Sequence, residues 1–99
     1  MQILAIEKEV AGITESDFEP HLKRAEAVSV WELHQAGVFR ELYFREDWPG
    51  AVLMLECEDV EAAREVLNTL PMVQAGLIAF DVIPLIPYPG FARLFFEET

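Results

Sequence analysis

The segment at residues 38–58 most constrains the fold, because it reads as two amphipathic strands joined by a tight turn at Trp48-Pro49-Gly50. In a strand, alternate side chains point to opposite faces of the sheet. Pairing Glu46 with Ala51 therefore gathers six side chains on one face: Glu41, Tyr43, Arg45, Val52, Met54 and Glu56. The other face receives an apolar set, namely Leu42, Phe44, Leu53, Leu55 and Cys57. We expect the apolar face to join a core, and the mixed face is a candidate site.

This pairing also predicts the neighbours across the hairpin. Tyr43 is expected opposite Met54, and Glu41 opposite Glu56, while Arg40 points toward the apolar side. A slip of one residue would exchange the two faces, so these assignments depend on the turn.

The rest of the chain predicts two helices and two further strands. A first strand is expected over residues 2–9, and Ser16-Asp17-Phe18-Glu19 matches a capping box that starts a helix ending at Gly37. Asp59 can cap a second helix that ends at Pro71, and residues 77–85 are rich in the β-branched side chains typical of strands. This order predicts an α+β, ferredoxin-like βαββαβ fold, with a four-stranded antiparallel sheet and both helices on one face.

Composition limits the classes of partner. The chain has 99 residues, which suits a single domain over 1–99, and a formal net charge of −11. Its scattered Lys and Arg residues form no basic stripe, which argues against nucleic acid and against an acidic membrane surface. Cys57 is the only cysteine and no segment is long enough to span a bilayer, so we expect a cytoplasmic protein. His21 and His34 lie too far apart to share a metal, and we expect no cofactor.

Helices on one face leave the opposite face of the sheet uncovered. We expect two such faces to close against each other in a dimer, forming an α+β barrel around a semi-polar cavity. The C-terminal tail at residues 88–99 carries four aromatic side chains, which seldom stay in water in so short a chain. We expect this tail to contact a neighbouring subunit or to cover a cavity mouth.

Several residues give the chain a resemblance to a known family. Gly37 and Arg40 open the second strand, Asn68-Thr69-Leu70-Pro71 ends the second helix, and a last strand runs through residues 81–85. Together with the length and the element order, this pattern resembles muconolactone Δ-isomerase and its relatives over about residues 3–89. The resemblance implies dimeric α+β barrels, often assembled into larger rings, and isomerisation of a small lactone acid by proton transfer without metal or organic cofactor. By position, it makes Arg40 a candidate to bind an anionic substrate.

The mixed face offers the groups that such a reaction needs. Moving a double bond within a lactone requires a base, a donor to the developing enolate and a cation for a carboxylate. Glu41 or Glu56 is the candidate base, because two facing carboxylates in a poorly hydrated cavity raise each other's proton affinity. Tyr43 is the candidate donor, and Arg45 can hold a carboxylate through paired hydrogen bonds. Asp81, inside an otherwise apolar strand, can join this acidic cluster.

The same side chains also allow a simpler interpretation. Glu41 and Glu56 can be solvated strand residues with Arg45 as their surface partner, and Asp81 can be an acid that discourages aggregation at a strand edge. Two other functions stay open: a non-catalytic small-molecule-binding or assembly module on the same barrel, and, by analogy of fold alone, a cofactor-independent oxygenase. The leading prediction is a cofactor-free isomerase acting on a small lactone or carbonyl acid.

Overall fold

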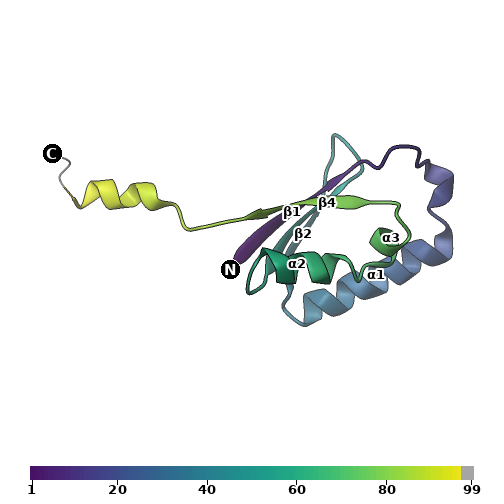
Figure 1. Ribbon diagram of the computed structural model, residues 1–99, viewed down its shortest axis with the longest axis horizontal. Helices are drawn as coiled ribbons and strands as arrows, with labels where there is room; N and C mark the ends of the chain where they lie inside the picture. Colours follow the sequence, from purple (N-terminus) through teal and green to yellow (C-terminus); the bar gives the residue numbers. More distant parts are fainter. Residues whose placement is uncertain (97–99) are drawn as a thin grey trace.

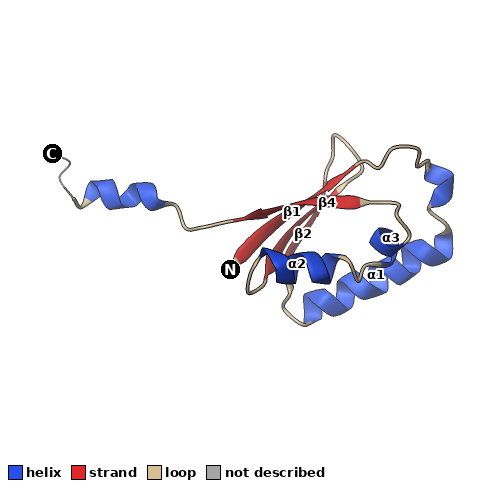
Figure 2. Cartoon of the chain, in the orientation of Figure 1, coloured by secondary structure: helices blue, strands red, loops and turns tan. Residues whose placement is uncertain are grey.

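The computed structural model describes residues 1–96, which form one antiparallel sheet with helices packed on one of its faces (Figure 1, Figure 2). The elements in chain order are β1 (Gln2–Lys8), η1 (Glu15–Asp17), α1 (Pro20–Gln35), β2 (Phe39–Phe44), β3 (Ala51–Glu56), α2 (Val60–Leu67), α3 (Pro71–Gln74), β4 (Ala79–Pro84) and η2 (Pro89–Leu94). The strands lie in the order β2-β3-β1-β4, and all the pairings are antiparallel. The predicted α+β, ferredoxin-like fold is confirmed. No helix among these residues is long and apolar enough to cross a membrane.

The first helix starts later than its predicted capping box. The box lies at Thr14 and Asp17, where the Thr14 N–H donates to the Asp17 carboxylate at 2.8 Å, and it opens the short helix η1. Helix α1 begins only at Pro20, because the proline ring disfavours a helical conformation at the residue before it. That residue, Glu19, is accordingly extended, with φ −67° and ψ 149°. The capping box predicted at residues 16–19 was therefore wrong.

The second helix begins as predicted, since the Asp59 carboxylate accepts a hydrogen bond from the Ala62 N–H at 2.8 Å. It ends at Leu67, before the predicted stop, and Pro71 instead begins the short helix α3. Leu70, between the two helices, is 1% exposed and belongs to the core. Burying a leucine side chain contributes about 1.5–3 kcal/mol, so this short connection is a stabilising part of the fold.

The hairpin register differs from the prediction by two residues. Tyr43 lies opposite Val52 and Glu41 opposite Met54, so the predicted pair of Glu41 with Glu56 was wrong. The strands separate earlier than predicted, because Phe44 is already paired with Ala51 and the connecting loop takes up residues 45–50. A shift by two keeps the side chains of residues 41–44 and 51–54 on their predicted faces.

A β-bulge at Arg40 breaks the alternation of β2. Phe39 pairs with Leu55 and Glu41 pairs with Met54, which leaves Arg40 as the extra residue. Phe39 is fully buried in the core, whereas Arg40 is exposed and its Nε donates to the carbonyl of Gly37. Arg40 therefore stays outside the core, and its orientation toward the helix side stays a prediction.

The core lies between the sheet and the helices. It consists of buried apolar side chains from the sheet, α2 and the connection after it: Ile3, Ala5, Phe39, Leu53, Leu55, Ala63, Leu67 and Leu70. The opposite side of the sheet, which we call the open face, carries no helix (Figure 1). Its side chains include Leu4, Ile6, Glu41, Tyr43, Val52, Met54, Asp81 and Ile83.

Beyond β4 the chain forms an extended arm that leaves the body of the molecule and ends in η2 (Figure 1). We call residues 85–96 the C-terminal arm. Its large apolar side chains are exposed, with Ile86 76%, Leu94 75% and Phe95 79% accessible. Residues 97–99 of the predicted tail lie outside the described part of the chain.

Candidate functional site

A pocket of about 550 Å³ lies on the helix side of the sheet, where β1 ends. We call it the helix-side pocket. Its apolar wall combines side chains from β2, α3, the hairpin loop, the connection before α1 and the connection after α3, among them Phe18, Phe44, Trp48, Met72 and Leu77. Its polar groups are mostly carboxylates and ammonium groups, namely Glu7, Lys8, Glu9, Glu15 and Lys23. A pocket of this size with an apolar wall and a few polar groups is typical of a small-molecule site.

Glu7 brings a carboxylate to the core side of the sheet. It follows Ile3 and Ala5 at alternate positions of β1, and those two side chains are fully buried. The Glu7 carboxylate accepts a hydrogen bond from the Ala51 N–H at 3.1 Å, which joins β1 to the start of β3. Loss of hydration on burial raises the pKa of Glu7, although the bond from Ala51 acts in the opposite direction. Glu7 therefore holds a proton more readily than a solvated glutamate.

Glu26 is a second half-buried carboxylate on the same side. It projects from α1 and accepts a hydrogen bond from the Met72 N–H in the first turn of α3, at 3.0 Å. Burial raises the pKa of Glu26, and the negative charge of Glu7 raises it further. Because Met72 itself lines the pocket, the two acids belong to one electrostatic environment.

This arrangement suits proton transfer. A carboxyl group with a pKa raised toward neutrality can act as a base when ionised and as an acid once it holds the proton. Glu7 lines the pocket, while Glu26 lies behind the Met72 backbone, whose N–H donates a hydrogen bond to it at the same wall. Lys23 supplies positive charge at the same pocket for an anionic substrate, whereas Lys8 is paired with Asp81.

The sequence-predicted site residues lie elsewhere, and the structure brings only two of them together. The Tyr43 hydroxyl donates to the Glu41 carboxylate at 2.9 Å on the open face. That hydrogen bond, together with the carboxylate charge, raises the pKa of Tyr43. Tyr43 is 61% exposed, so this pair meets solvent in the single chain.

The other predicted residues each have a local partner. Arg45 donates two hydrogen bonds to Asp47, at 2.9 and 2.8 Å, and its guanidinium lies 5.7 Å from the centre of the Trp48 ring. The Glu56 carboxylate lies 3.2 Å from the N-terminal ammonium group, and the Asp81 carboxylate lies 3.2 Å from the Lys8 ammonium. The single chain therefore does not assemble Arg45, Glu56 and Asp81 into one cluster.

Each of the two histidines also has a polar partner close to it in the sequence. His34 Nδ1 lies 2.8 Å from the carbonyl oxygen of Phe39, and His21 Nδ1 lies 3.2 Å from the Glu19 carboxylate. Among the described residues, no three His, Cys, Asp or Glu side chains are grouped so that they could hold a metal ion.

Sequence reasoning missed Glu7 and Glu26, although each leaves a signal. Glu7 shares its strand parity with Ile3 and Ala5, so it must face the core side if they do. Glu26 lies one helical turn after Leu22 and one before Val30, both half-buried, so it interrupts an apolar stripe of α1. A carboxylate at a core-facing position is a stronger indication of a site than one on a solvent-exposed face.

The architecture defines the class of fold: a ferredoxin-like α+β domain with a pocket of about 550 Å³ on the helix side of its sheet. Among solved structures, the chain is similar to muconolactone isomerase, with a TM-score of 0.69 and 20% identity, covering 90% of this chain and 92% of that chain. It is equally similar to 5-chloro-2-hydroxyhydroquinone dehydrochlorinase from Burkholderia phenoliruptrix AC1100, in complex with 2,5-dihydroxybenzoquinone. That comparison gives a TM-score of 0.69 and 17% identity, covering 91% of this chain and 98% of the other.

These similarities confirm the predicted resemblance to muconolactone isomerase at the level of the fold. The sequence itself matches no family model and no curated protein. The two structural relatives act on different small molecules, as their names state. The shared fold therefore does not assign roles to the residues of this chain.

Proposed function

We propose that this protein is a cofactor-free isomerase that moves a proton within a small lactone or carbonyl acid, and that it does so in the helix-side pocket. The observation that carries the proposal is the pair of half-buried carboxyls, Glu7 and Glu26, whose pKa values are both raised beside a pocket of about 550 Å³. Groups with perturbed pKa values in a pocket are favoured candidates for acid–base catalysis. The similarity of fold to muconolactone isomerase and to a dehydrochlorinase supports action on a small molecule.

In the proposed reaction, the ionised carboxylate of Glu7 removes a proton from the carbon beside the substrate carbonyl. The electron pair of that C–H bond moves into the conjugated system and forms a dienolate. Glu7, now protonated, returns the proton to the far carbon of the dienolate, which shifts the double bond and restores the carboxylate. Lys23 pairs with the substrate carboxylate, and Glu26, which accepts a hydrogen bond from the Met72 N–H, holds α3 at the pocket wall.

The open face is a second candidate site for the same chemistry. There the hydrogen bond between Tyr43 and Glu41, at 2.9 Å, joins a donor to a possible base. Glu56 stays a candidate base, and Arg45, Arg40 and Asp81 stay candidates for substrate binding. This site requires a second copy of the chain to cover the face, because Glu41 and Tyr43 are exposed in the single chain.

We further propose that the chain self-associates as a dimer or a larger ring in the cytoplasm. The open face places apolar side chains such as Leu4, Val52 and Met54 beside Glu41 and Tyr43, and two such faces can close into a barrel. The exposed apolar side chains of the C-terminal arm favour contact with another subunit. A non-catalytic binding or assembly module on the same barrel is the main alternative, and a cofactor-independent oxygenase rests on fold analogy alone.

Deuterium exchange tests the reaction and locates it. Candidate lactone acids, beginning with muconolactone, are incubated with the protein in D₂O, and loss of the proton signal beside the carbonyl is followed by NMR. We expect Glu7→Gln to slow this exchange by about 10²-fold or more, since a positioned acid–base group contributes roughly that much. Glu65→Gln, an exposed charge on α2, is the matched control and should leave the rate unchanged.

The other outcomes are equally informative. Loss of exchange in Glu41→Gln or Tyr43→Phe, with Glu7→Gln unaffected, would move the reaction to the open face. Absence of exchange with every lactone acid, together with saturable binding of those acids, would contradict the isomerase proposal and favour a binding module.

A further inference from the structure

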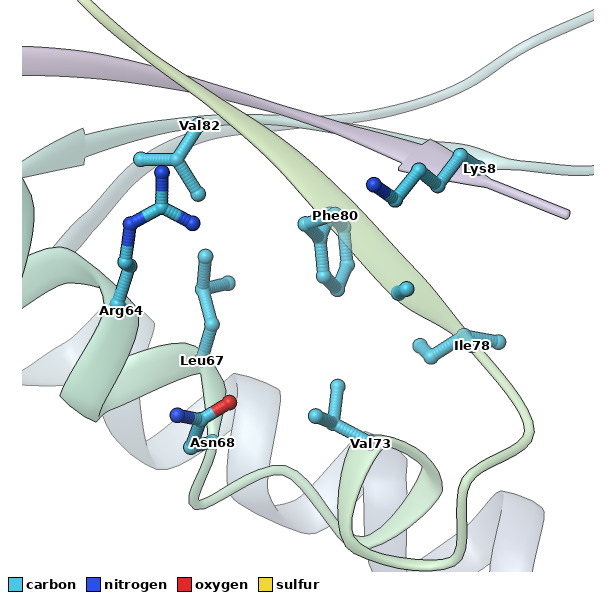
Figure 3. A pocket seen from close by; sticks show the side chains of 9 residues that line it. Lys8, Arg64, Leu67, Asn68, Val73, Ile78, Phe80 and Val82 are labelled. Atoms are coloured by element: carbon cyan, nitrogen blue, oxygen red, sulfur yellow. The ribbon is translucent and has the colours of Figure 1, made fainter. Parts of the chain in front are cut away.

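A second cavity, of about 200 Å³, lies between α2, α3 and β4 (Figure 3). We call it the α2–β4 cavity. The described residues that line it include two cations, Arg64 and Lys8, and no acid. The chain as a whole has 18 acidic and 7 basic residues, so a cavity lined by positive charge alone stands out from its surroundings.

The wall of this cavity is mainly apolar. Leu67 and Ile78 are buried, and Val73, Phe80 and Val82 are half-buried. In Figure 3 the side chains of Leu67, Val73 and Phe80 point into the space between α2 and β4. Such a wall removes apolar ligand surface from water, which favours binding of a compact hydrocarbon group.

The polar end of the cavity is formed by α2. Arg64 and Asn68 are four residues apart, so their side chains lie on the same face of the helix end. Figure 3 shows the guanidinium group of Arg64 directed toward Val82, at the rim of the cavity. No ion pair found among the described residues involves Arg64, whereas Lys8 is paired with Asp81 at 3.2 Å. Arg64 is thus the cation available to a ligand.

These features specify the chemistry of the ligand. A guanidinium group binds a carboxylate through two parallel hydrogen bonds, and the Asn68 amide can supply a further donor. A closed cavity of about 150 Å³ admits a benzene molecule, so about 200 Å³ suits one ring or a short branched chain. We propose that the α2–β4 cavity binds a small monocarboxylate with a compact apolar body, the carboxylate on Arg64 and the apolar body against Phe80, Val82 and Leu67.

This site is distinct from the helix-side pocket, and the proposal does not depend on the proposed function. The two share Lys8 and Ile78 in their linings, but Glu7 does not line the α2–β4 cavity. A carboxylic acid bound in the α2–β4 cavity therefore lies beside the helix-side pocket and does not contact Glu7, the proposed base. Because both spaces touch α3 and Ile78, a ligand in one can alter binding in the other.

Benzoate is the probe for the test, and methyl NMR of the full chain is the measurement. We expect saturable shifts at the methyl groups of Leu67, Val73 and Val82. Arg64→Gln should weaken binding by roughly tenfold or more, because hydrogen bonds between charged groups are the strong ones. The affinity of Arg64→Lys for benzoate should lie between those of the wild-type chain and Arg64→Gln, since lysine keeps the charge and loses the paired hydrogen bonds.

Two controls make the test specific. Arg24→Gln removes an exposed arginine from α1 that lines neither cavity, and it should leave the affinity unchanged. Benzyl alcohol, which has the ring without the carboxylate, should bind at least about tenfold more weakly than benzoate. Equal affinity of the wild-type chain and Arg64→Gln would overturn the proposal. Shifts confined to Val10, Ile13 and Leu77 would also overturn it, because they would place benzoate in the helix-side pocket. So would the absence of any saturable shift.

Discussion

The side-chain carboxylate of Glu26 accepts a hydrogen bond from the backbone N–H of Met72 at 3.0 Å, although the two residues are 46 positions apart in the chain. Glu26 lies in α1 and Met72 in α3, so this bond joins the two helices at the wall of the helix-side pocket. Burial raises the pKa of Glu26, as it does that of Glu7. The hydrogen bonds that Glu26 accepts from Met72 and that Glu7 accepts from Ala51 therefore both involve carboxyl groups with raised pKa values.

The raised pKa values predict a pH dependence of stability. Both pKa values lie above 4.5 in the folded chain, so the folded state keeps protons that the unfolded chain releases. The free energy of unfolding should therefore fall as pH rises from 4.5 through the raised values. A Glu7→Gln, Glu26→Gln double variant should lose this part of the slope. At neutral pH it should be more stable than the wild type by less than about 1 kcal/mol per site, since both side chains are only half-buried.

Urea unfolding at a series of pH values from about 4 to about 8 measures this slope. A Glu61→Gln, Glu65→Gln variant, which removes the same charge from the exposed side of α2, is the matched control. If both double variants change the slope equally, general repulsion among the acidic residues explains it, and the assignment to Glu7 and Glu26 is wrong.

A close approach in the hairpin loop gives a second prediction. A β carbon added at Gly50 would overlap Cζ3 of Trp48, so the indole would have to move. Gly50→Ala should therefore destabilise the fold by about 1–3 kcal/mol, as overpacking does elsewhere. Trp48 lines the helix-side pocket, so the same change should weaken ligand binding there.

A double-mutant cycle isolates this contact. In a Trp48→Ala background the clashing indole is absent. The loss of unfolding free energy caused by Gly50→Ala should therefore be smaller than in the wild-type background, by about 0.5–3 kcal/mol. Equal costs in the two backgrounds would mean that the alanine acts through the loop backbone and not through Trp48. Chemical unfolding of the four chains provides the measurement.

The C-terminal arm predicts a change of mass on truncation. Deletion of the residues after Pro89 removes Phe91, Leu94, Phe95 and Phe96, all of which are exposed in the single chain. We expect the particle mass measured by light scattering to fall, because these side chains contact a neighbouring subunit in the proposed assembly. A substitution of Tyr88 alone serves as a milder companion variant. An unchanged particle mass after truncation would show that the C-terminal arm takes no part in self-association.

The fold could be predicted because its signals are local. Alternation in the strands, the Asp59 cap and the order of elements all lie within short windows, and the structure bears them out. The faces of the hairpin were right although the register was wrong, since an error of two residues preserves parity. The loop at residues 45–50 decides the register, through the bond from the Arg45 N–H to the Gly50 carbonyl at 2.8 Å.

The candidate site was less predictable, because its geometry is tertiary. The bond from Met72 to Glu26 requires α1 and α3 to lie side by side, and no local pattern specifies that approach. The predicted pairing of Glu41 with Glu56 assumed a shorter loop, whereas the loop at residues 45–50 places Glu41 opposite Met54. The Glu56 N–H instead donates to the Val38 carbonyl at 2.9 Å.

The bulge at Arg40 has a consequence for changes in chain length. In a regular strand Phe39 and Glu41 would share a face, and only the extra residue lets one enter the core while the other lies on the open face. Removing Arg40 altogether would make Phe39 and Glu41 neighbours and would keep both on their present faces. This strand can therefore lose a residue at that point without disturbing the core. A single-residue deletion further along β2 would instead move every side chain between the deletion and the bulge to the opposite face of the sheet.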